Sequence, residues 1–463
     1  IKTMTDPKST KLLLALLFTG TLMGALDLAI IGPALPVIQA EFGMQQRELA
    51  GLINSYTLLQ MLGALLLAKF ADRVGPRLIY IISILLFATG SLQIVLAESA
   101  WMLNFGRAMQ GFGAGGVFPA AASVIGARLP PKERGPALGI LGAVWGIAFL
   151  IGPILGGIFL RFSWQWLFAI NLPIALVLII GAMKMLPGHS GREPAPFDIK
   201  GTILLMLGLS ALMLAVSNLD STAPLESLLS LPVSGGMIML VLVTAIFWQV
   251  EKRAQDPIVM PTLFNSAQVR KSCIISVGVS AIQAGTIFIP ALLVISLDVS
   301  PANSALLLLP GVIAATIMAP VAGRLINKTG TRLILVVSQI LMLISLAVYA
   351  FTDLSMTSFI IVSILAGIGS AGLVGAPLRF IMLAESGASD RASAQGVISV
   401  TSSMGRIFGA SAVGAVAASY GGDVVRYQAA FTGLVVLGII VMLAAITLNS
   451  KAAEDSAAEA KLA

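Results

Sequence analysis

Asp27 is the residue whose type and position most clearly predict chemistry. It lies inside an almost wholly apolar stretch, TLMGALDLAIIGPALP, at residues 21–36. Ionisable side chains inside apolar, membrane-like segments are costly and mark functional sites by default. A carboxyl group whose surroundings alternate can bind a proton on one side of a membrane and release it on the other. The sequence therefore predicts proton binding and release at Asp27.

Arg107 is the natural partner for this carboxylate. Asp27 is about ten residues from the outer end of its apolar segment, and Arg107 is six or seven from the outer end of its own. With a helical rise of about 1.5 Å per residue, their depths differ by only about 5–6 Å. We expect both in one polar cluster with Gln110; the alternative is a static buried pair that only fixes packing.

The elements that must position these groups are membrane-spanning helices. Of the 463 residues, 57% are hydrophobic and 11% are charged, whereas soluble domains are about a quarter charged. Apolar runs of ~20 residues span a bilayer as helices, which satisfy their own backbone hydrogen bonds. Fourteen are expected, the first too long for a cleavable signal and therefore retained. Their limits are 12–38, 48–70, 77–97, 100–127, 136–160, 165–186, 199–219, 227–250, 271–296, 302–326, 331–351, 355–378, 392–418 and 428–449.

The basic residues support this count. With the N-terminus in the cytoplasm, 22 of the 28 lysines and arginines fall in cytoplasmic segments, as the positive-inside rule requires. Three are external, namely Arg47, Arg161 and Arg426. The other three lie within spans or at their ends, namely Arg107, Arg379 and Arg406. We expect a multi-pass protein of the cell membrane with both termini cytoplasmic. The net charge of +7 then reflects topology, and no nucleic-acid partner is expected.

Several classes of chemistry are not expected. The single cysteine, Cys273, excludes an internal disulfide and a thiolate metal site. The single histidine, His189, lies in a polar linker. We find no phosphate-binding glycine loop, metal-ligand cluster or catalytic constellation in the sequence. We therefore expect no enzyme, no metal and no cofactor, and an ion gradient rather than ATP as the energy source.

An internal repeat organises the chain. AKFADRVGPRLI at residues 68–79 aligns with GRLINKTGTRLI at residues 323–334, an offset of 255. Each copy follows the second span of a six-span block, which indicates two homologous halves in parallel orientation. The expected domains are a six-helix bundle at 1–187, a linker with two additional spans at 188–270, a second six-helix bundle at 271–450, and a cytoplasmic tail at 451–463.

Five motifs carry a family resemblance. They are TLMGALDLAIIGPALP, AKFADRVGPR, RAMQGFGAGG, GAVWGIAFLIGPILGG and WQWLFAINLP, each on the expected span. Together they resemble the major facilitator superfamily, and the fourteen spans resemble its drug:proton antiporter branch. The sequence departs from the family pattern at Ala68, Phe70 and Pro76 of the loop signature and at Ala29, where a threonine is usual.

The resemblance implies an all-α membrane protein with two six-helix bundles and two additional helices between them. It also implies a conformational latch at the repeated cytoplasmic turns, although an ordinary charged turn that sets topology is the alternative. The latch residues are Asp72, Arg73, Gly75, Arg77, Gly323, Gly330 and Arg332. A hinge or seal in the fifth span is also implied, with simple close packing as the alternative. Its residues are Gly152, Pro153, Gly156 and Gly157.

A central cavity for substrate is expected between the bundles. Four aromatic residues are candidates for its wall, and each could instead pack in the core or face lipid: Tyr56, Phe118, Trp145 and Phe149. Gln283 is a further candidate. Arg406 is expected either to contact polar or anionic substrate groups or to pair with helix ends. Arg379 is expected to snorkel to the membrane interface.

The expected function is proton-coupled export of lipophilic or amphiphilic compounds by alternating access, of the multidrug efflux type. Because the predicted spans nine to fourteen contain no acid, an exporter or flippase of lipids or anionic amphiphiles is the alternative. A non-transporting membrane receptor or scaffold is a remote one. The expected partners are a lipophilic or lipid substrate, protons and membrane lipids, with the protein acting as a monomer.

Overall fold

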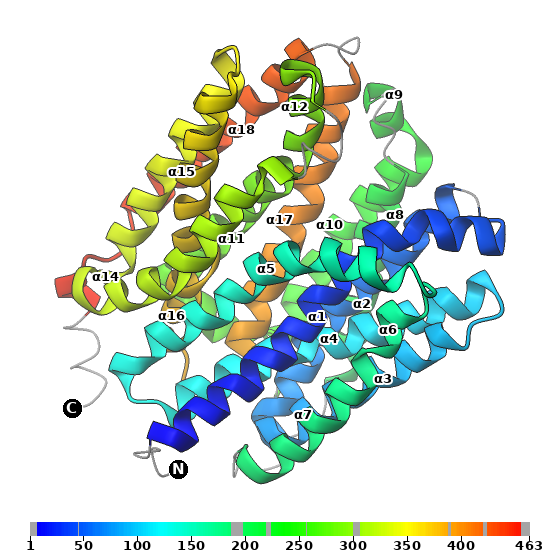
Figure 1. Cartoon of the computed structure of the whole chain (residues 1–463). Helices are drawn as coiled ribbons and strands as arrows, with labels where there is room; N and C mark the ends of the chain where they lie inside the picture. The colour runs from blue at the N-terminus through cyan, green and yellow to red at the C-terminus, as the bar shows by residue number, and fades with distance from the viewer. Residues whose placement is uncertain are drawn as a thin grey trace.

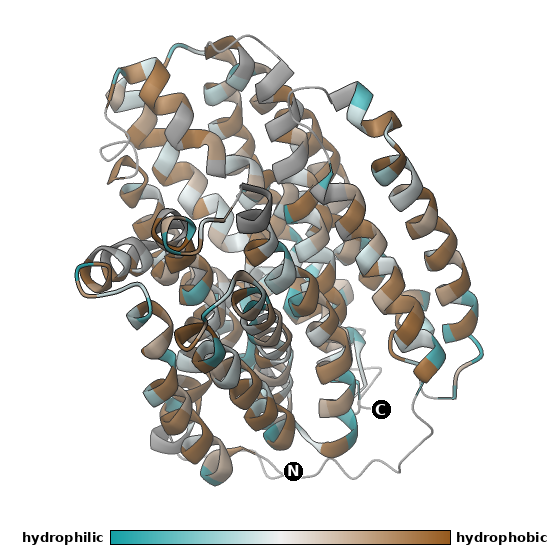
Figure 2. Ribbon diagram, turned by 90° about the vertical axis from the view of Figure 1, so that its right-hand side faces the viewer, coloured by the Kyte–Doolittle hydropathy of each residue, from teal (hydrophilic) through white to brown (hydrophobic). Residues whose placement is uncertain are grey.

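The computed structural model describes residues 7–44, 46–186, 198–218, 224–255, 257–299, 306–387, 390–419 and 424–454. Over these residues the chain is helical and contains no strand (Figure 1). Nine of the described helices are long and apolar enough to cross a membrane. Figure 2 shows hydrophobic residues along most of the length of these helices. The expectation of an all-helical membrane protein is confirmed.

The N-terminal bundle contains the first six predicted spans. Its helices are α1 (Pro7–Phe42), α2 (Gln46–Val74), α3 (Pro76–Val95), α4 (Ala100–Arg128), α5 (Pro131–Phe159), α6 (Trp166–Ala169) and α7 (Asn171–Met185). Helix α2 ends at Val74, and Gly75 follows it with a φ of 95°, which favours glycine. Pro76 then occupies the first turn of α3, where its missing N–H costs nothing. The turn between the second and third spans therefore follows directly from the GP dipeptide.

Two additional helices follow the N-terminal bundle. They are α8 (Ile199–Ser217) and α10 (Leu231–Glu251), with the short α9 (Pro224–Leu229) between them. Helices α8 and α10 pack on each other, and α8 also packs on α2. Large apolar side chains of α10 are exposed, among them Ile238, Val241 and Leu242, as expected for helices that face lipid.

The C-terminal bundle contains the remaining predicted spans. Its elements are η1 (Pro261–Asn265), α11 (Ala267–Gly285), η2 (Thr286–Phe288), α12 (Ile289–Leu297), α14 (Leu309–Phe351), α15 (Met356–Val374), α16 (Ala376–Glu385), α17 (Arg391–Ser419) and α18 (Val424–Ile446). Helix α14 covers two predicted spans and breaks at Gly330, where φ is 79°. Gly330 corresponds to Gly75 in the sequence repeat, so the two copies share a turn as well as a sequence.

The two bundles pack against each other through α5 with α14 and through α2 with α17. Glycines allow this approach. A Cβ atom placed on Gly135 or on Gly323 would lie 2.4 Å from the backbone oxygen of the other residue, and one on Gly396 would lie 2.3 Å from the oxygen of Ala64. Because α2 corresponds to the first part of α14 in the repeat, the two contacts are related by the internal symmetry.

Candidate functional site

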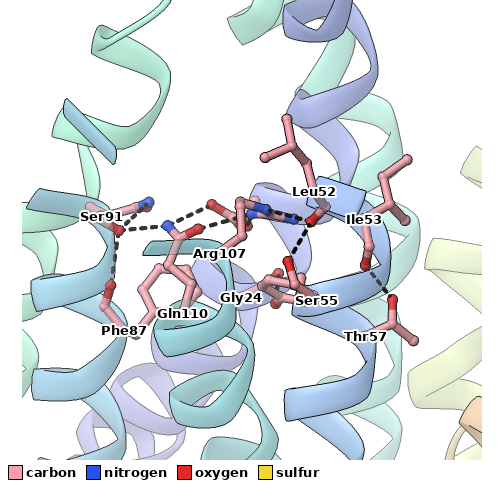
Figure 3. A network of polar contacts seen from close by, with 12 residues as sticks. Gly24, Leu52, Ile53, Ser55, Thr57, Phe87, Ser91, Arg107 and Gln110 are labelled. Carbon is pink, nitrogen blue, oxygen red and sulfur yellow. Dashed lines mark hydrogen bonds and ion pairs between the residues drawn. The ribbon is translucent and has the colours of Figure 1, made fainter. Parts of the chain in front are cut away.

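The centre of the site is a buried ion pair between α1 and α4. Arg107 Nη1 donates to Asp27 Oδ2 and, over 2.9 Å, to Gln110 Oε1 (Figure 3). Gln110 Nε2 donates to Asp27 Oδ1 over 3.1 Å. All three side chains are at most 1% exposed. The structure therefore brings together the three residues that the sequence places in one cluster.

Arg107 also has partners other than the carboxylate. Its Nε donates to the backbone oxygen of Leu52 over 3.3 Å, and its guanidinium carbon lies 4.3 Å from the ring centroid of Tyr56. The Tyr56 hydroxyl donates to the backbone oxygen of Gly24 over 3.4 Å. Tyr56, a candidate for the cavity wall, is fully buried in this state. Its ring faces the cation of the ion-pair cluster.

The polar network extends to α3 and α7. Gln110 Nε2 donates to Ser91 Oγ over 2.7 Å, and Asn171 Nδ2 donates to the same oxygen over 3.2 Å. Sequence reasoning missed both Ser91 and Asn171. The signal for Asn171 is its place in WQWLFAINLP, whereas a lone serine inside an apolar helix carries none.

Glycines in RAMQGFGAGG bring α4 close enough for this geometry. A Cβ atom placed on Gly111 would lie 2.1 Å from the backbone oxygen of Tyr56, and one on Gly115 would lie 2.3 Å from that of Gln60. On the α3 side, a Cβ on Gly113 would lie 2.5 Å from the oxygen of Ser83. This close packing holds α4 against α2, so Arg107 reaches Leu52 and Tyr56 directly.

Asp72 forms a second polar contact, between the bundles. Its Oδ2 accepts hydrogen bonds from the backbone nitrogen of Ser393 over 2.7 Å and from Ser393 Oγ over 2.6 Å. Ser393 lies in the first turn of α17, where unpaired N–H groups favour an anionic acceptor. In the second repeat copy, Asn327 Nδ2 donates to the backbone oxygen of Lys132 over 2.5 Å, at the start of α5.

The other predicted latch residues lie at the two repeated turns or in the helices next to them. Gly75 and Gly330 form the turns, and Gly323 packs on Gly135. Arg77 acts inside the N-terminal bundle, where its Nε donates to the backbone oxygen of Leu186 over 2.6 Å. The side chains of Arg73 and Arg332 are partly exposed.

The predicted hinge lies where α5 meets α1. A Cβ atom placed on Gly152 would lie 2.6 Å from Ala29 Cβ, so two motif positions pack directly together. Gly156 is buried. The side chain of Pro153 and the surroundings of Gly157 lie outside the described part of the structure.

The predicted cavity residues have different contacts and different degrees of burial. The guanidinium carbon of Arg379, on α16, lies 3.7 Å from the ring centroid of Phe118, on α4. Arg406 Nη2 donates to Ser403 Oγ over 2.8 Å in the middle of α17. Gln283 is half-buried on α11. The side chains of Trp145 and Phe149 lie outside the described part of the structure.

The prediction that Arg379 snorkels to the interface was wrong. It rested on a span ending near residue 378, but after a bend at Gly375 the helix continues through α16 to Glu385. Arg379 is therefore well inside the helix. It extends across the bundle interface to Phe118 rather than toward the membrane surface.

Comparison with known proteins decides the family. The family model described as Major Facilitator Superfamily matches residues 17–267 and 273–462. The chain belongs to the major facilitator superfamily. As a member of this superfamily it is a multi-pass membrane transporter and not an enzyme.

Other superfamily members are similar over most of the chain. An uncharacterised MFS-type transporter, YfiU of Bacillus subtilis, is 32% identical over 408 residues, which are 87% of this chain and 79% of the relative. The multidrug transporter protein MdtP of the same organism is 30% identical over 419 residues, or 88% of this chain and 74% of the relative. The MFS-type efflux pump LUC4 of a Fusarium species is 31% identical over 404 residues, or 84% and 70%.

A solved structure shares the superfamily fold. The crystal structure of the human organic anion transporter MFSD10 aligns with a TM-score of 0.72, covering 95% of this chain and 100% of that one. The sequence identity is 16%. At this identity the likeness concerns the fold, and it supports the two-bundle arrangement described above.

Proposed function

We propose that this transporter exports lipophilic or amphiphilic compounds from the cell in exchange for protons. Fourteen spans, cytoplasmic termini and a place in the cell membrane are part of the proposal. The observation that carries it is the burial of Asp27 beside Arg107 and Gln110. Relatives named as a multidrug transporter and an efflux pump support the class of activity.

The cluster suits a carboxyl group that gains and loses a proton. When Asp27 is ionised, Arg107 compensates its charge. When Asp27 is protonated, its O–H needs an acceptor, which the Gln110 amide would offer by turning its oxygen in place of its nitrogen toward the carboxyl group. Arg107 then still has the Leu52 carbonyl and the Tyr56 ring as partners. Both protonation states therefore leave the Asp27 carboxyl with hydrogen-bond partners, although Arg107 Nη2 is buried without one in this state.

Alternating access couples this site to substrate. The contacts of Asp72 with Ser393 and of Gly135 with Gly323 lie at the ends of helices that the charge distribution assigns to the cytoplasm. In our proposal this arrangement is the state closed toward the cytoplasm. Rocking of the two bundles would break these contacts and admit substrate from the inside.

Replacement of Asp27 tests the proton coupling. Asp27→Asn keeps the size of the side chain and one acceptor oxygen but removes the titratable group. In proteoliposomes with an internal pH dye, substrate-induced proton movement should be lost, while thermal stability in detergent should show a folded protein. Asp353→Asn, at an exposed position, is the matched control and should behave as the parent. Unchanged proton movement with Asp27→Asn would sink the proposal.

A second candidate function is export or flipping of lipids or anionic amphiphiles. The favouring observation is the pair of arginines, Arg379 and Arg406, in a half whose predicted spans contain no acid. Movement of a fluorescent lipid between leaflets without any proton gradient would favour this candidate. Lipid movement that depends on the gradient and on Asp27 would instead make lipid one of the exported amphiphiles.

A further inference from the structure

Arg379 is a partly buried cation. It lies outside the proton-coupling cluster of Asp27, Arg107 and Gln110. It extends from α16 of the C-terminal bundle to the face of Phe118 on α4 of the N-terminal bundle, at 3.7 Å. The contact therefore joins two parts of the chain that must separate during alternating access. A cation that has a ring face but no carboxylate as a partner in the described part of the chain is available for a stronger one.

The other neighbours of Arg379 are neutral. Its Nη1 donates to Gln395 Oε1 over 3.3 Å and to Ser399 Oγ over 3.4 Å, both long contacts. Among the described residues, no carboxylate forms an ion pair with it. A guanidinium has five N–H donors. Because Nη1 alone makes these bonds and the side chain is only partly buried, the remaining donors are open to a ligand.

A second cation reinforces the positive charge. Arg406, on α17, lies close enough to Arg379 for the two guanidinium groups to repel each other. A Coulomb interaction also links Arg406 to Tyr56 of the N-terminal bundle. The Asp27 carboxylate is already compensated by Arg107. Arg379 and Arg406 therefore add positive charge to the part of the bundle interface that the structure describes.

We propose that Arg379 recognises the anionic headgroup of the transported amphiphile, a carboxylate, sulfonate or phosphate. In the state closed toward the cytoplasm, the face of Phe118 occupies the guanidinium. When the bundles separate on that side, the anion takes its place. This inference rests on the proposed function, because the exchange of partners needs alternating access.

The physical basis is the difference between the two partners. A guanidinium binds a carboxylate or phosphate through two parallel, charge-assisted hydrogen bonds, which are stronger than contact with a ring face. The apolar face of the ring keeps the cation from being left bare in a region of low dielectric constant. Phe118 is therefore a competitor that the ligand displaces, and the preference for anions comes from Arg379.

Equilibrium binding tests the proposal without any transport step. The probes are two radiolabelled amphiphiles of equal chain length, an alkyl sulfonate and an alkyl trimethylammonium. Both are measured by scintillation proximity on the full chain in nanodiscs. Arg379→Gln should weaken sulfonate binding about tenfold or more, the scale of one lost charge-assisted pair, and should leave ammonium binding unchanged or tighter. Arg379→Lys should fall between, because a lysine keeps the charge and loses the fork.

Two further variants separate recognition from packing. Arg253→Gln removes a basic residue at an exposed position and should alter neither ligand. Phe118→Leu removes the competing ring face and should tighten sulfonate binding, which loss of a merely structural contact would not do. Equal weakening of both ligands by Arg379→Gln, or no tightening by Phe118→Leu, would overturn the proposal. The binding assay does not measure proton movement. If Asp27→Asn still binds the sulfonate in preference to the ammonium ligand, headgroup recognition is independent of the proton coupling.

Discussion

At the scale of single residues, the molecule depends on the buried ion pair of Arg107 and Asp27, whose members differ in the number of other groups that they contact. Arg107 contacts the Leu52 carbonyl, Gln110 and the Tyr56 ring as well as Asp27. Asp27 has fewer partners, Arg107 and Gln110 with the Asn171 amide beside them. Loss of the cation should therefore cost more than loss of the anion.

We expect Arg107→Gln to lower the free energy of unfolding by about 3–5 kcal/mol, because it leaves an uncompensated buried carboxylate. The double variant Asp27→Asn/Arg107→Gln removes that charge and should be more stable than Arg107→Gln alone. Denaturant unfolding of the four proteins in detergent gives the coupling energy. If the effects of the two substitutions simply add, the pair is not an energetic unit.

At the scale of helices, glycine decides how closely α4 approaches α2. We expect Gly111→Ala to cost about 1–3 kcal/mol of stability by overpacking, because its Cβ would lie 2.1 Å from a backbone oxygen that cannot move aside. It should also reduce substrate-induced proton movement, since α4 carries Arg107. Gly433→Ala is the matched control, because nothing lies within 4 Å of its Cβ position. Thermal unfolding of both proteins checks this, and equal stability would contradict the packing argument.

The same elements show what sequence alone predicts. Asp27, Arg107 and Gln110 were placed together because helical rise converts sequence position into depth, and depth limits which side chains can meet. Depth does not give the direction in which a residue points around the helix, so Ser91 and Asn171 were missed. The position of Arg379 was predicted wrongly because the chain bends at Gly375 and then continues as a helix to Glu385. The composition of the apolar segment does not show this continuation.

At the scale of the whole molecule, the internal repeat predicts two symmetry-related contacts between bundles. The sequence identifies Asp72 and Asn327 as equivalent, and each contacts the start of a helix in the opposite bundle, α17 and α5 respectively. The two contacts differ in strength. The Asp72 carboxylate accepts two hydrogen bonds at a helix N-terminus, whereas Asn327 donates one neutral hydrogen bond to a backbone oxygen. The conformational balance should therefore depend more on the first copy than on the second.

Asp72→Ala should shift the population toward the state open on the side where α2 meets α17. Loss of an N-terminal cap costs about 0.5–2 kcal/mol, so the ratio of the two states should change several-fold. Spin labels at Glu133→Cys and Lys328→Cys, both exposed positions, in a Cys273→Ser background, report the distance between the bundles. Asn327→Ala should lengthen that distance in a smaller fraction of molecules, because it removes the weaker contact. Equal distance distributions in the parent and Asp72→Ala would mean that this contact sets topology alone and does not hold the bundles together.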